Sequence, residues 1–350
     1  MPELRKDPVL GRWIIISKSR GKRPNDFSVE GYKTEDGFCP LCPGNEHATP
    51  PEVLAFREGD DGREQAPWLV RVVPNKYPAL IIEGDLEKEG VGLYDQMNGI
   101  GAHEVIVESP DHNHLFADLS PKEMVLVFRA YSERIRDLQK DQRFKYVMVF
   151  KNHGSAAGAS LEHSHSQLIA LPILPRMIVS ELAGAESYFR YKERCLFCDM
   201  IRQEIQMDKR VVCQNDLFIT IMPFAPRTPF EMWVLPKYHS SGFCRQNDEE
   251  LYSLAEVFSE TMKRLNSCIP NVQYNFVLHT EPLRSGGLEH FHFHFEIVPK
   301  LTSIAGFEWG SGFYINPMPP EDATILMREA LDDPAADETE GKNLPTLDVE

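Results

Sequence analysis

Two histidines at alternate positions, His163 and His165, directly follow a loop of small residues that spans 154–160. Small residues allow backbone N–H groups to approach an anion closely, as phosphate-binding loops require. Because alternate residues of a strand share one face, we expect His163, His165 and Gln167 on the same side of a strand. Such a loop beside a row of imidazoles indicates phosphoryl or nucleotidyl transfer. The alternative is a Gly/Ala-rich turn followed by a half-buried strand, which has the same residue pattern and no catalytic role.

Four of the seven cysteines lie in two Cys-x-x-Cys pairs, and histidines follow each pair in the same order. Thiolates and imidazoles together form a closed tetrahedral set that suits Zn²⁺. We therefore predict two zinc ions per chain, with cysteines bound to metal rather than to each other. The predicted ligands are Cys39, Cys42, His112 (with His114 as its rival) and His163 in the first half, and Cys195, Cys198, His239 and either His290 or His292 in the second.

The two halves of the chain share one order of motifs. His112 precedes His163 by 51 residues, and His239 precedes His290 by 51. Each final stretch reads Glu-His-x-His-x, followed by Gln or His. This duplication predicts two copies of one α+β unit, the first at 1–175 and the second at 176–330. Residues 331–350 hold seven acids against one lysine, which predicts a disordered acidic tail.

Periodicity and capping signals predict the elements that would position these residues. Ser120-Pro-Lys-Glu indicates a helix start with Ser120 as the N-cap, and apolar residues at helical spacing follow as far as Leu138. A second helix is predicted from residue 247 or 248 to residue 265. Strands are predicted at 13–16, 69–73, 104–108, 146–150, 218–222, 233–235 and 274–278.

The composition is that of a globular protein, because 42% of the 350 residues are hydrophobic and no run reaches the length of a membrane span. A polar N-terminus without an apolar leader predicts a cytoplasmic location and no membrane partner. The formal charge of −16 argues against nucleic acid as a partner. A basic segment at 18–23 is exceptional in so acidic a chain and could meet an anionic ligand.

The motifs resemble those of the galactose-1-phosphate uridylyltransferase family of the histidine-triad superfamily. The resemblance extends from about residue 3 to residue 330 and leaves only the acidic tail uncovered. It implies two histidine-triad-like repeats, each a mainly antiparallel twisted sheet with flanking helices. The matching pieces are Ser-Arg-Gly-Lys-Arg-Pro (19–24), Cys-Pro-Leu-Cys (39–42), Pro-Asn-Lys-Tyr-Pro-Ala (74–79), Ser-Pro-Asp-His (109–112), the 152–172 stretch and Gly-Phe-Glu-Trp-Gly-Ser-Gly-Phe-Tyr-Ile-Asn-Pro (306–317).

The resemblance implies that His165 is a nucleophile that attacks the α-phosphorus of a nucleoside-diphosphate sugar. Sugar 1-phosphate would leave, and a second acceptor would take the nucleotidyl group from the histidine, which predicts ping-pong kinetics. His163 would bind zinc and hold the loop, while Ser160 and the loop amides would hold phosphate oxygens. Gln167 favours transfer over hydrolysis, because a sugar phosphate leaves as a stable anion and an amide hydrogen bond suffices.

Substrate-binding residues are implied by the same resemblance. Asn75 and Asn152 would contact ribose or phosphate, and Arg20 and Arg23 would lie near the nucleotide. The sugar phosphate would be bound across the interface of a homodimer by Phe307, Glu308, Ser311 and Gly312. For the second zinc site, the internal repeat favours His290, whereas alignment of the final strand with plant relatives favours His292, which we prefer slightly.

Ser164 departs from the His-Pro-His that many members of this family carry. His-Ser-His-Ser-Gln at 163–167 resembles the plant branch that acts on adenylyl donors. Our first hypothesis is exchange between UDP-glucose and galactose 1-phosphate in galactose metabolism, and our second is release of ADP from ADP-glucose by phosphate. A zinc-stabilised nucleotide-binding module without turnover and a histidine-triad hydrolase are further alternatives. The row His290, His292 and His294 is interpreted as structural, because the loop before it lacks the small-residue run.

Overall fold

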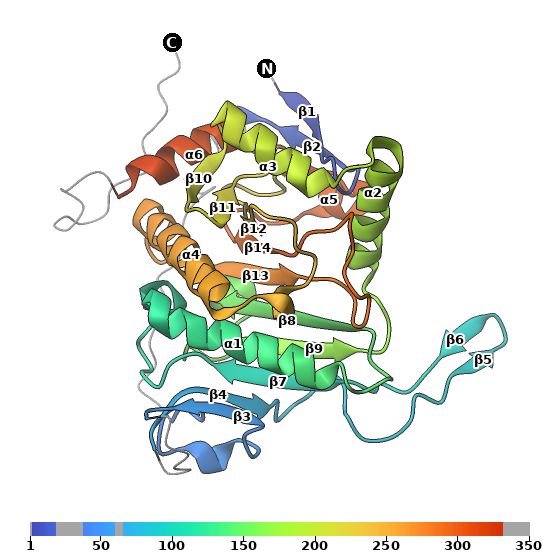
Figure 1. Cartoon of the computed structure of the whole chain (residues 1–350), viewed down its shortest axis with the longest axis vertical. Coiled ribbons are helices and arrows are strands. Elements are labelled where there is room, and N and C mark those ends of the chain that lie inside the picture. The colour runs from blue at the N-terminus through green and yellow to red at the C-terminus, as the bar shows by residue number, and fades with distance from the viewer. Residues whose placement is uncertain (1, 19–37, 60–65, 332–350) are drawn as a thin grey trace.

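One sheet of ten strands forms the centre of the protein, in a computed structural model that describes residues 2–18, 38–59 and 66–331 (Figure 1). Every pairing in this sheet is antiparallel. Two long helices, α1 (Pro121–Leu138) and α4 (Asp248–Cys268), lie side by side over one of its faces (Figure 1). The predicted α+β class with antiparallel strands is confirmed.

The strand order is the same in the two halves of the chain. The first half contributes β3-β4-β7-β9-β8 and the second contributes β10-β11-β12-β14-β13, and β8 pairs with β13 in the middle. The two halves therefore share one continuous sheet. The strands of the first half are β3 (Leu54–Arg57), β4 (Trp68–Pro74), β7 (Ala102–Val107), β8 (Tyr146–His153) and β9 (His165–Leu171), and those of the second are β10 (Val211–Gln214), β11 (Phe218–Ile221), β12 (Met232–Pro236), β13 (Tyr274–His279) and β14 (His294–Pro299).

Smaller elements surround this sheet. The N-terminal strands β1 (Glu3–Lys6) and β2 (Trp13–Ile16) form a second sheet with β15 (Tyr314–Asn316), so the start of the chain lies against its C-terminal part. A hairpin of β5 (Glu89–Val91) and β6 (Tyr94–Gln96) projects from the body (Figure 1). The remaining helices are α2 (Arg176–Lys192), α3 (Leu196–Met207), α5 (Gly306–Ser311) and α6 (Pro320–Glu329), with short 3-10 helices at Glu46–Ala48, Phe116–Asp118, Ser155–Ala157 and Phe243–Arg245.

Capping fixes where the two long helices begin. The Ser120 hydroxyl accepts from the Glu123 N–H at 3.4 Å, and the Glu123 carboxylate accepts from the Ser120 N–H at 2.8 Å. Asn247 and Glu250 form the same reciprocal pair at the start of α4. Each pair satisfies backbone donors that the first turn leaves without partners. Both predicted helix starts are confirmed.

The main core lies between these helices and the sheet. Phenylalanines from both halves interlock there, with the rings of Phe128, Phe258, Phe276 and Phe295 5.1–5.9 Å apart between neighbours and mostly edge to face. A second cluster on the C-terminal half joins α3 to strands β11 and β12. Within the described residues, no helix is both long and apolar enough to cross a membrane. The predicted acidic tail, from residue 332 onward, lies outside the described residues.

Candidate active site and metal centres

Strand β9 presents His165 and Ser166, its first two residues, to opposite faces. Ser166 points toward α1, where the Tyr131 hydroxyl donates to its Oγ at 2.7 Å in the buried core. Strand alternation then places His165 and Gln167 on the face away from α1. The expected alternation is therefore observed for His165 and Gln167, whereas His163 precedes the strand.

The His165 ring has one free nitrogen. Its Nδ1 lies 2.8 Å from the carbonyl oxygen of His163, and a carbonyl accepts only, so Nδ1 carries the hydrogen and donates. Nε2 of the neutral ring then keeps its lone pair, and no described residue forms a hydrogen bond with it. Burial, followed by the nearby Lys151 charge, lowers the pKa of His165 below its ordinary value. The ring is thus held neutral with Nε2 available, as a nucleophile requires.

A buried ion pair supports the backbone of this histidine. Lys151 Nζ lies 2.5 Å from Glu108 Oε2, and both side chains are at most 1% exposed. The same ammonium donates to the carbonyl oxygen of His165 at 2.9 Å and to Ser164 Oγ at 3.1 Å. Ser164 in turn donates to Glu108 at 2.7 Å. The serine that replaces proline in this motif therefore connects the histidine strand to a charged network in the core.

The small-residue loop between β8 and β9 is held by the second half of the chain. Gln273 Oε1 accepts from the Ala156 N–H at 2.7 Å, and Asn275 donates to the Ala157 carbonyl at 2.8 Å. Gly154 has φ +87° and ψ 156°, a combination essentially restricted to glycine. Ser160 ends the loop on the exposed surface. The N–H groups of Ala157, Gly158 and Ala159 donate to carbonyls within the loop, so the shape of the loop depends on its own turn and on both repeats.

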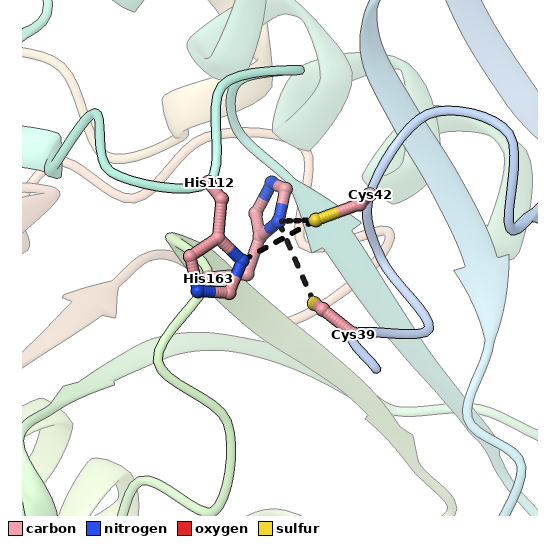
Figure 2. Close-up of side chains that lie close together, drawn as sticks. All are labelled: Cys39, Cys42, His112 and His163. Atoms are coloured by element: carbon pink, nitrogen blue, oxygen red, sulfur yellow. Dashed lines mark hydrogen bonds between the residues drawn. The ribbon is translucent and has the colours of Figure 1, made fainter. Parts of the chain in front are cut away.

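The first predicted metal group is assembled (Figure 2). Cys39, Cys42, His112 and His163 converge from three segments of the chain, with their ligand atoms within 4.8 Å of one another. Cys42 Sγ lies 3.3 Å and 3.5 Å from Nδ1 of His112 and His163, and Cys39 Sγ lies 3.7 Å from Nδ1 of His163. Zinc bonds of about 2.3 Å to sulfur and about 2.0 Å to nitrogen at tetrahedral angles would separate these atoms by about 3.5 Å. The donor set and its spacing fit Zn²⁺.

Hydrogen bonds orient the imidazole of His163 for this role. Its Nε2 donates to the Ser109 carbonyl at 2.8 Å, which leaves the Nδ1 lone pair facing the sulfurs. Burial, together with the neighbouring Cys39, raises the pKa of the Cys42 thiol to about 11 when no cation is present. A bound cation would reverse that effect and hold both thiolates. His114, the rival ligand, is not part of the group.

The second predicted group has the same construction. Cys195, Cys198, His239 and His292 come together, and Nδ1 of His292 lies 3.3 Å from Cys195 Sγ. Nε2 of His292 donates to the Tyr238 carbonyl at 3.1 Å, and Nε2 of His239 donates to the Leu288 carbonyl at 3.0 Å. Nδ1 of His292 therefore faces Cys195, and Nδ1 of His239 lies 3.7 Å from Cys198 Sγ.

His290, the alternative ligand that the repeat favoured, lies outside this group. The reason is a shift of two residues between the repeats. His163 lies two residues before the start of β9, and His292, not His290, lies two residues before the start of β14. The spacing of 51 residues, which His239 and His290 share with His112 and His163, therefore indicated the wrong histidine of the second repeat.

A third group was missed by sequence reasoning. Glu181, His279, His294 and Glu296 bring four ligand atoms within 4.8 Å of one another, and all four are buried. The Glu181 carboxylate lies 2.8 Å from Nδ1 of His279. Burial would raise the pKa of Glu296, but the charges of Arg227 and His279 outweigh it and hold that pKa at about 2. The residues come from α2, β13 and β14 at irregular spacing, so no local motif announces them.

Some of the predicted substrate-binding residues lie near the histidine strand and others lie far from it. Asn152 accepts from Asn275 at 2.8 Å beside the loop, and Asn75 accepts from the Tyr77 N–H at 2.8 Å at the end of β4. Arg20 and Arg23 lie outside the described residues. Helix α5 and its cap carry the remaining four, Phe307, Glu308, Ser311 and Gly312, at the end of the molecule away from β9 (Figure 1). Within the described part of one chain, no hydrogen bond joins α5 to the loop before β9.

The fold and these groups define a class of protein. A duplicated antiparallel unit with the His-x-His-x-Gln strand and paired Cys/His groups is the architecture of histidine-triad-like nucleotidyltransferases. The model of the N-terminal domain of galactose-1-phosphate uridyl transferase matches residues 1–175, and that of a domain of unknown function, DUF4921, matches residues 100–343. The chain belongs to the galactose-1-phosphate uridylyltransferase family of nucleotidyltransferases.

Relatives that are named for different activities match almost the whole chain. ADP-glucose phosphorylase of Arabidopsis thaliana is 36% identical over 335 residues, 94% of this chain and 93% of the relative. Galactose-1-phosphate uridylyltransferase of Thermotoga maritima is 30% identical over 94% of this chain and 98% of the relative. The crystal structure of the Arabidopsis enzyme with bound ADP-glucose superimposes with a TM-score of 0.79 at 35% identity, covering 94% of this chain and 98% of that one. A solved uridylyltransferase gives 0.73 at 29% identity, over 95% and 99%.

Proposed function

We propose that this chain transfers a nucleotidyl group from a nucleoside-diphosphate sugar to a phosphate acceptor through a covalent bond to Nε2 of His165. The observation that carries the proposal is the His165 ring itself. Its Nδ1 is committed to the His163 carbonyl at 2.8 Å, and Nε2 has no hydrogen-bond partner among the described residues. The neighbouring Gln167 is an amide rather than an acid, which suits a leaving group that is already a stable anion.

Two displacements at phosphorus make up the proposed reaction. In the first, Nε2 forms a bond to the α-phosphorus, the bond to the bridging oxygen breaks, and sugar 1-phosphate leaves. In the second, an oxygen of the acceptor phosphate attacks the same phosphorus and the N–P bond breaks, which restores the neutral ring. The imidazolium of the intermediate is stabilised by the His163 carbonyl that accepts from Nδ1. Ser160 would hold a phosphate oxygen, whereas the amides of residues 156–159 already donate to Gln273 or within the loop.

Zinc enters this proposal as a structural element, with two ions per chain. The first Cys/His group would hold one ion and the second group the other, because both donor sets are closed and have the spacing of tetrahedral Zn²⁺. When bound, the ion supplies rigidity rather than reactivity. His163 would then be fixed at its ring by metal and at its carbonyl by His165.

For the donor we favour ADP-glucose, with inorganic phosphate as acceptor and ADP as product. The support is the 36% identity to ADP-glucose phosphorylase together with the His-Ser-His-Ser-Gln pattern at 163–167. This choice reverses the order of our two sequence-based hypotheses. UDP-glucose with galactose 1-phosphate is the second candidate, supported by the matched uridyl transferase family and by the 30% identical relative.

We also propose that the protein works as a homodimer. The four residues predicted to hold the sugar phosphate lie on or beside α5, and no hydrogen bond connects α5 with the histidine loop within the described part of one chain. Phe307 and Trp309 on that helix are 49% and 79% exposed, which leaves them free for a partner chain. Light scattering after size exclusion would test this directly, because a monomer at working concentration would contradict the proposal.

Covalent labelling tests the function. The zinc-loaded protein is incubated with ADP-glucose or UDP-glucose labelled at the α-phosphorus, and the labelled peptide is identified after acid-free digestion. We expect label on His165 from ADP-glucose, none in His165→Asn, and full label in the control His47→Asn, whose side chain is exposed. Stronger labelling from UDP-glucose would make the second candidate the function.

Two other outcomes would contradict the proposal. Binding of both donors without any label would identify a nucleotide-binding module. Release of free nucleoside monophosphate into water, in preference to transfer to phosphate or galactose 1-phosphate, would identify a hydrolase.

A further inference from the structure

We propose that His103 is a positioning residue that fixes the orientation of the Gln167 amide and so turns its NH₂ group toward the phosphate. This inference rests on the proposed function, since Gln167 matters only if a phosphoryl group passes beside it. His103 lies half-buried on β7, next to β9 in the sheet. It matches no motif, and sequence reasoning did not find it.

The protonation of the His103 ring follows from its partners. The backbone N–H of Ala79 points at Nδ1 over 3.1 Å, and a backbone amide can only donate. Nδ1 is therefore the acceptor, and in the neutral ring Nε2 must carry the hydrogen. Gln167 Oε1 lies 2.8 Å from Nε2 and accepts that hydrogen.

The Asn75 side chain also lies close to Nε2 of His103 but does not form a hydrogen bond with it in this tautomer. Its Oδ1 accepts from the Tyr77 N–H at 2.8 Å, so its NH₂ group is the end that lies 3.2 Å from His103 Nε2. A ring nitrogen that carries a hydrogen cannot accept one from Asn75, and a ring that accepted at both nitrogens would have to be an anion. The bond to Gln167 is the one consistent with the Ala79 contact.

The consequence for Gln167 is a fixed amide. With Oε1 bound to His103, the NH₂ group has no acceptor among the described residues and remains available as a donor. The reversed amide would present an oxygen lone pair to an anionic phosphoryl group and would repel it. Donors aimed in advance at developing charge contribute strongly to catalysis, and their misplacement is correspondingly costly.

The position of His103 connects two elements of the site, the 75–79 turn and strand β9. Its backbone carbonyl accepts from the Asn75 N–H at 2.8 Å, and its ring contacts both the 75–79 turn and Gln167. A turn that carries one predicted nucleotide-binding residue is thereby tied to the strand that carries the nucleophile. A single imidazole thus sets the relative placement of Asn75 and Gln167.

A double-mutant cycle tests this inference through Gln167. His103→Leu removes both ring contacts, and we expect the rate of label formation at saturating donor to fall about 10²-fold, the loss expected of a misplaced catalytic group. His103→Gln keeps a donor at the same reach and should recover most of that rate. In a Gln167→Ala background, His103→Leu should change the rate by less than about threefold, because the two residues act as one unit.

The failures can be told apart. Label on His165 of the wild type with additive effects in the cycle would overturn the role of His103 and leave the proposed function standing. Absence of label from either donor would overturn the proposed function. Nitrogen-15 NMR of the His103 ring needs no activity, and a hydrogen on Nδ1 rather than on Nε2 would overturn the inference in either case.

Discussion

Removal of the Lys151 charge is the sharpest test of how the histidine strand is supported. Lys151→Met keeps an unbranched apolar side chain without the ammonium group, and it leaves the Glu108 carboxylate in the core with only hydroxyl partners. Ser164 still donates to that carboxylate at 2.7 Å, and Tyr131 lies 3.4 Å from it. Because the Glu108 side chain is 0% exposed, water cannot replace the lost ammonium.

The expected cost follows from this burial. Breaking a buried ion pair on one side costs about 3–5 kcal/mol, because the remaining charge is stranded, whereas replacing both partners is often close to neutral. We therefore expect Lys151→Met to lower the free energy of unfolding by about 3–5 kcal/mol. The pair Lys151→Met with Glu108→Gln should recover at least about half of that loss.

Urea unfolding of the zinc-loaded protein, followed by circular dichroism, measures both variants. Lys140→Met is the matched control, because Lys140 pairs with Asp137 on the surface and its side chain is 76% exposed. That control should cost less than about 0.5 kcal/mol. The reasoning fails if Lys151→Met costs no more than the control, or if the second substitution adds to the loss instead of reducing it.

Three further predictions concern other parts of the molecule. His292→Ala should lower bound zinc from two ions per chain to one by mass spectrometry of the metal, and His290→Ala should leave two; equal losses would contradict the ligand assignment. Gly154→Ala should lower the free energy of unfolding in urea by about 1–3 kcal/mol, because the φ of +87° is strained for any residue with a Cβ and that Cβ would lie 2.4 Å from the Gln273 side chain. An unchanged free energy of unfolding would show that this position does not require glycine. Burial, followed by the Lys151 charge, lowers the pKa of His153 from 6.5 to about 4. Between these two values a falling pH protonates this histidine in the unfolded chain first, so the free energy of unfolding decreases. His153→Gln should reduce this decrease, and an unchanged pH dependence of the free energy of unfolding would contradict the prediction.

Local signals in the sequence predicted much of the frame. The capping box at Ser120 and the polar start at Asn247 placed both long helices, because caps act within one turn. Seven of the eight Cys and His residues that the structure gathers were named from their order in two repeats, whereas His292 was favoured by alignment of the final strand with plant relatives. These successes share one cause, which is that each signal is contained in a short stretch or in its repetition.

Contacts between distant segments could not be predicted in the same way. Glu108, Lys151 and Ser164 look like ordinary strand residues until β7, β8 and β9 become neighbours. His103 is found only when the Ala79 amide and the Gln167 side chain are both known. Their roles arise from contacts between neighbouring strands, and the spacing of residues along the chain does not predict which strands become neighbours.

A comparison of the two repeats shows why we propose His165 as the nucleophile and not its counterpart in the second repeat. His294 occupies the position of His165 at the start of its strand, and its Nδ1 donates to the His292 carbonyl at 3.2 Å, as that of His165 does to the His163 carbonyl at 2.8 Å. The backbone arrangement is thus the same in both halves. The surroundings decide the difference.

In the second repeat the face that would receive a nucleotide is filled. Trp233 lies 5.2 Å from the His294 ring, and the Glu181 carboxylate lies 4.0 Å from its Nε2. The residue two positions further along is Glu296, a carboxylate, where the first repeat has the amide of Gln167. An anion at that point would repel a phosphate, whereas an amide can donate to it. Duplication therefore supplied two scaffolds, and the side chains around Nε2 left only the first one suited to phosphoryl chemistry.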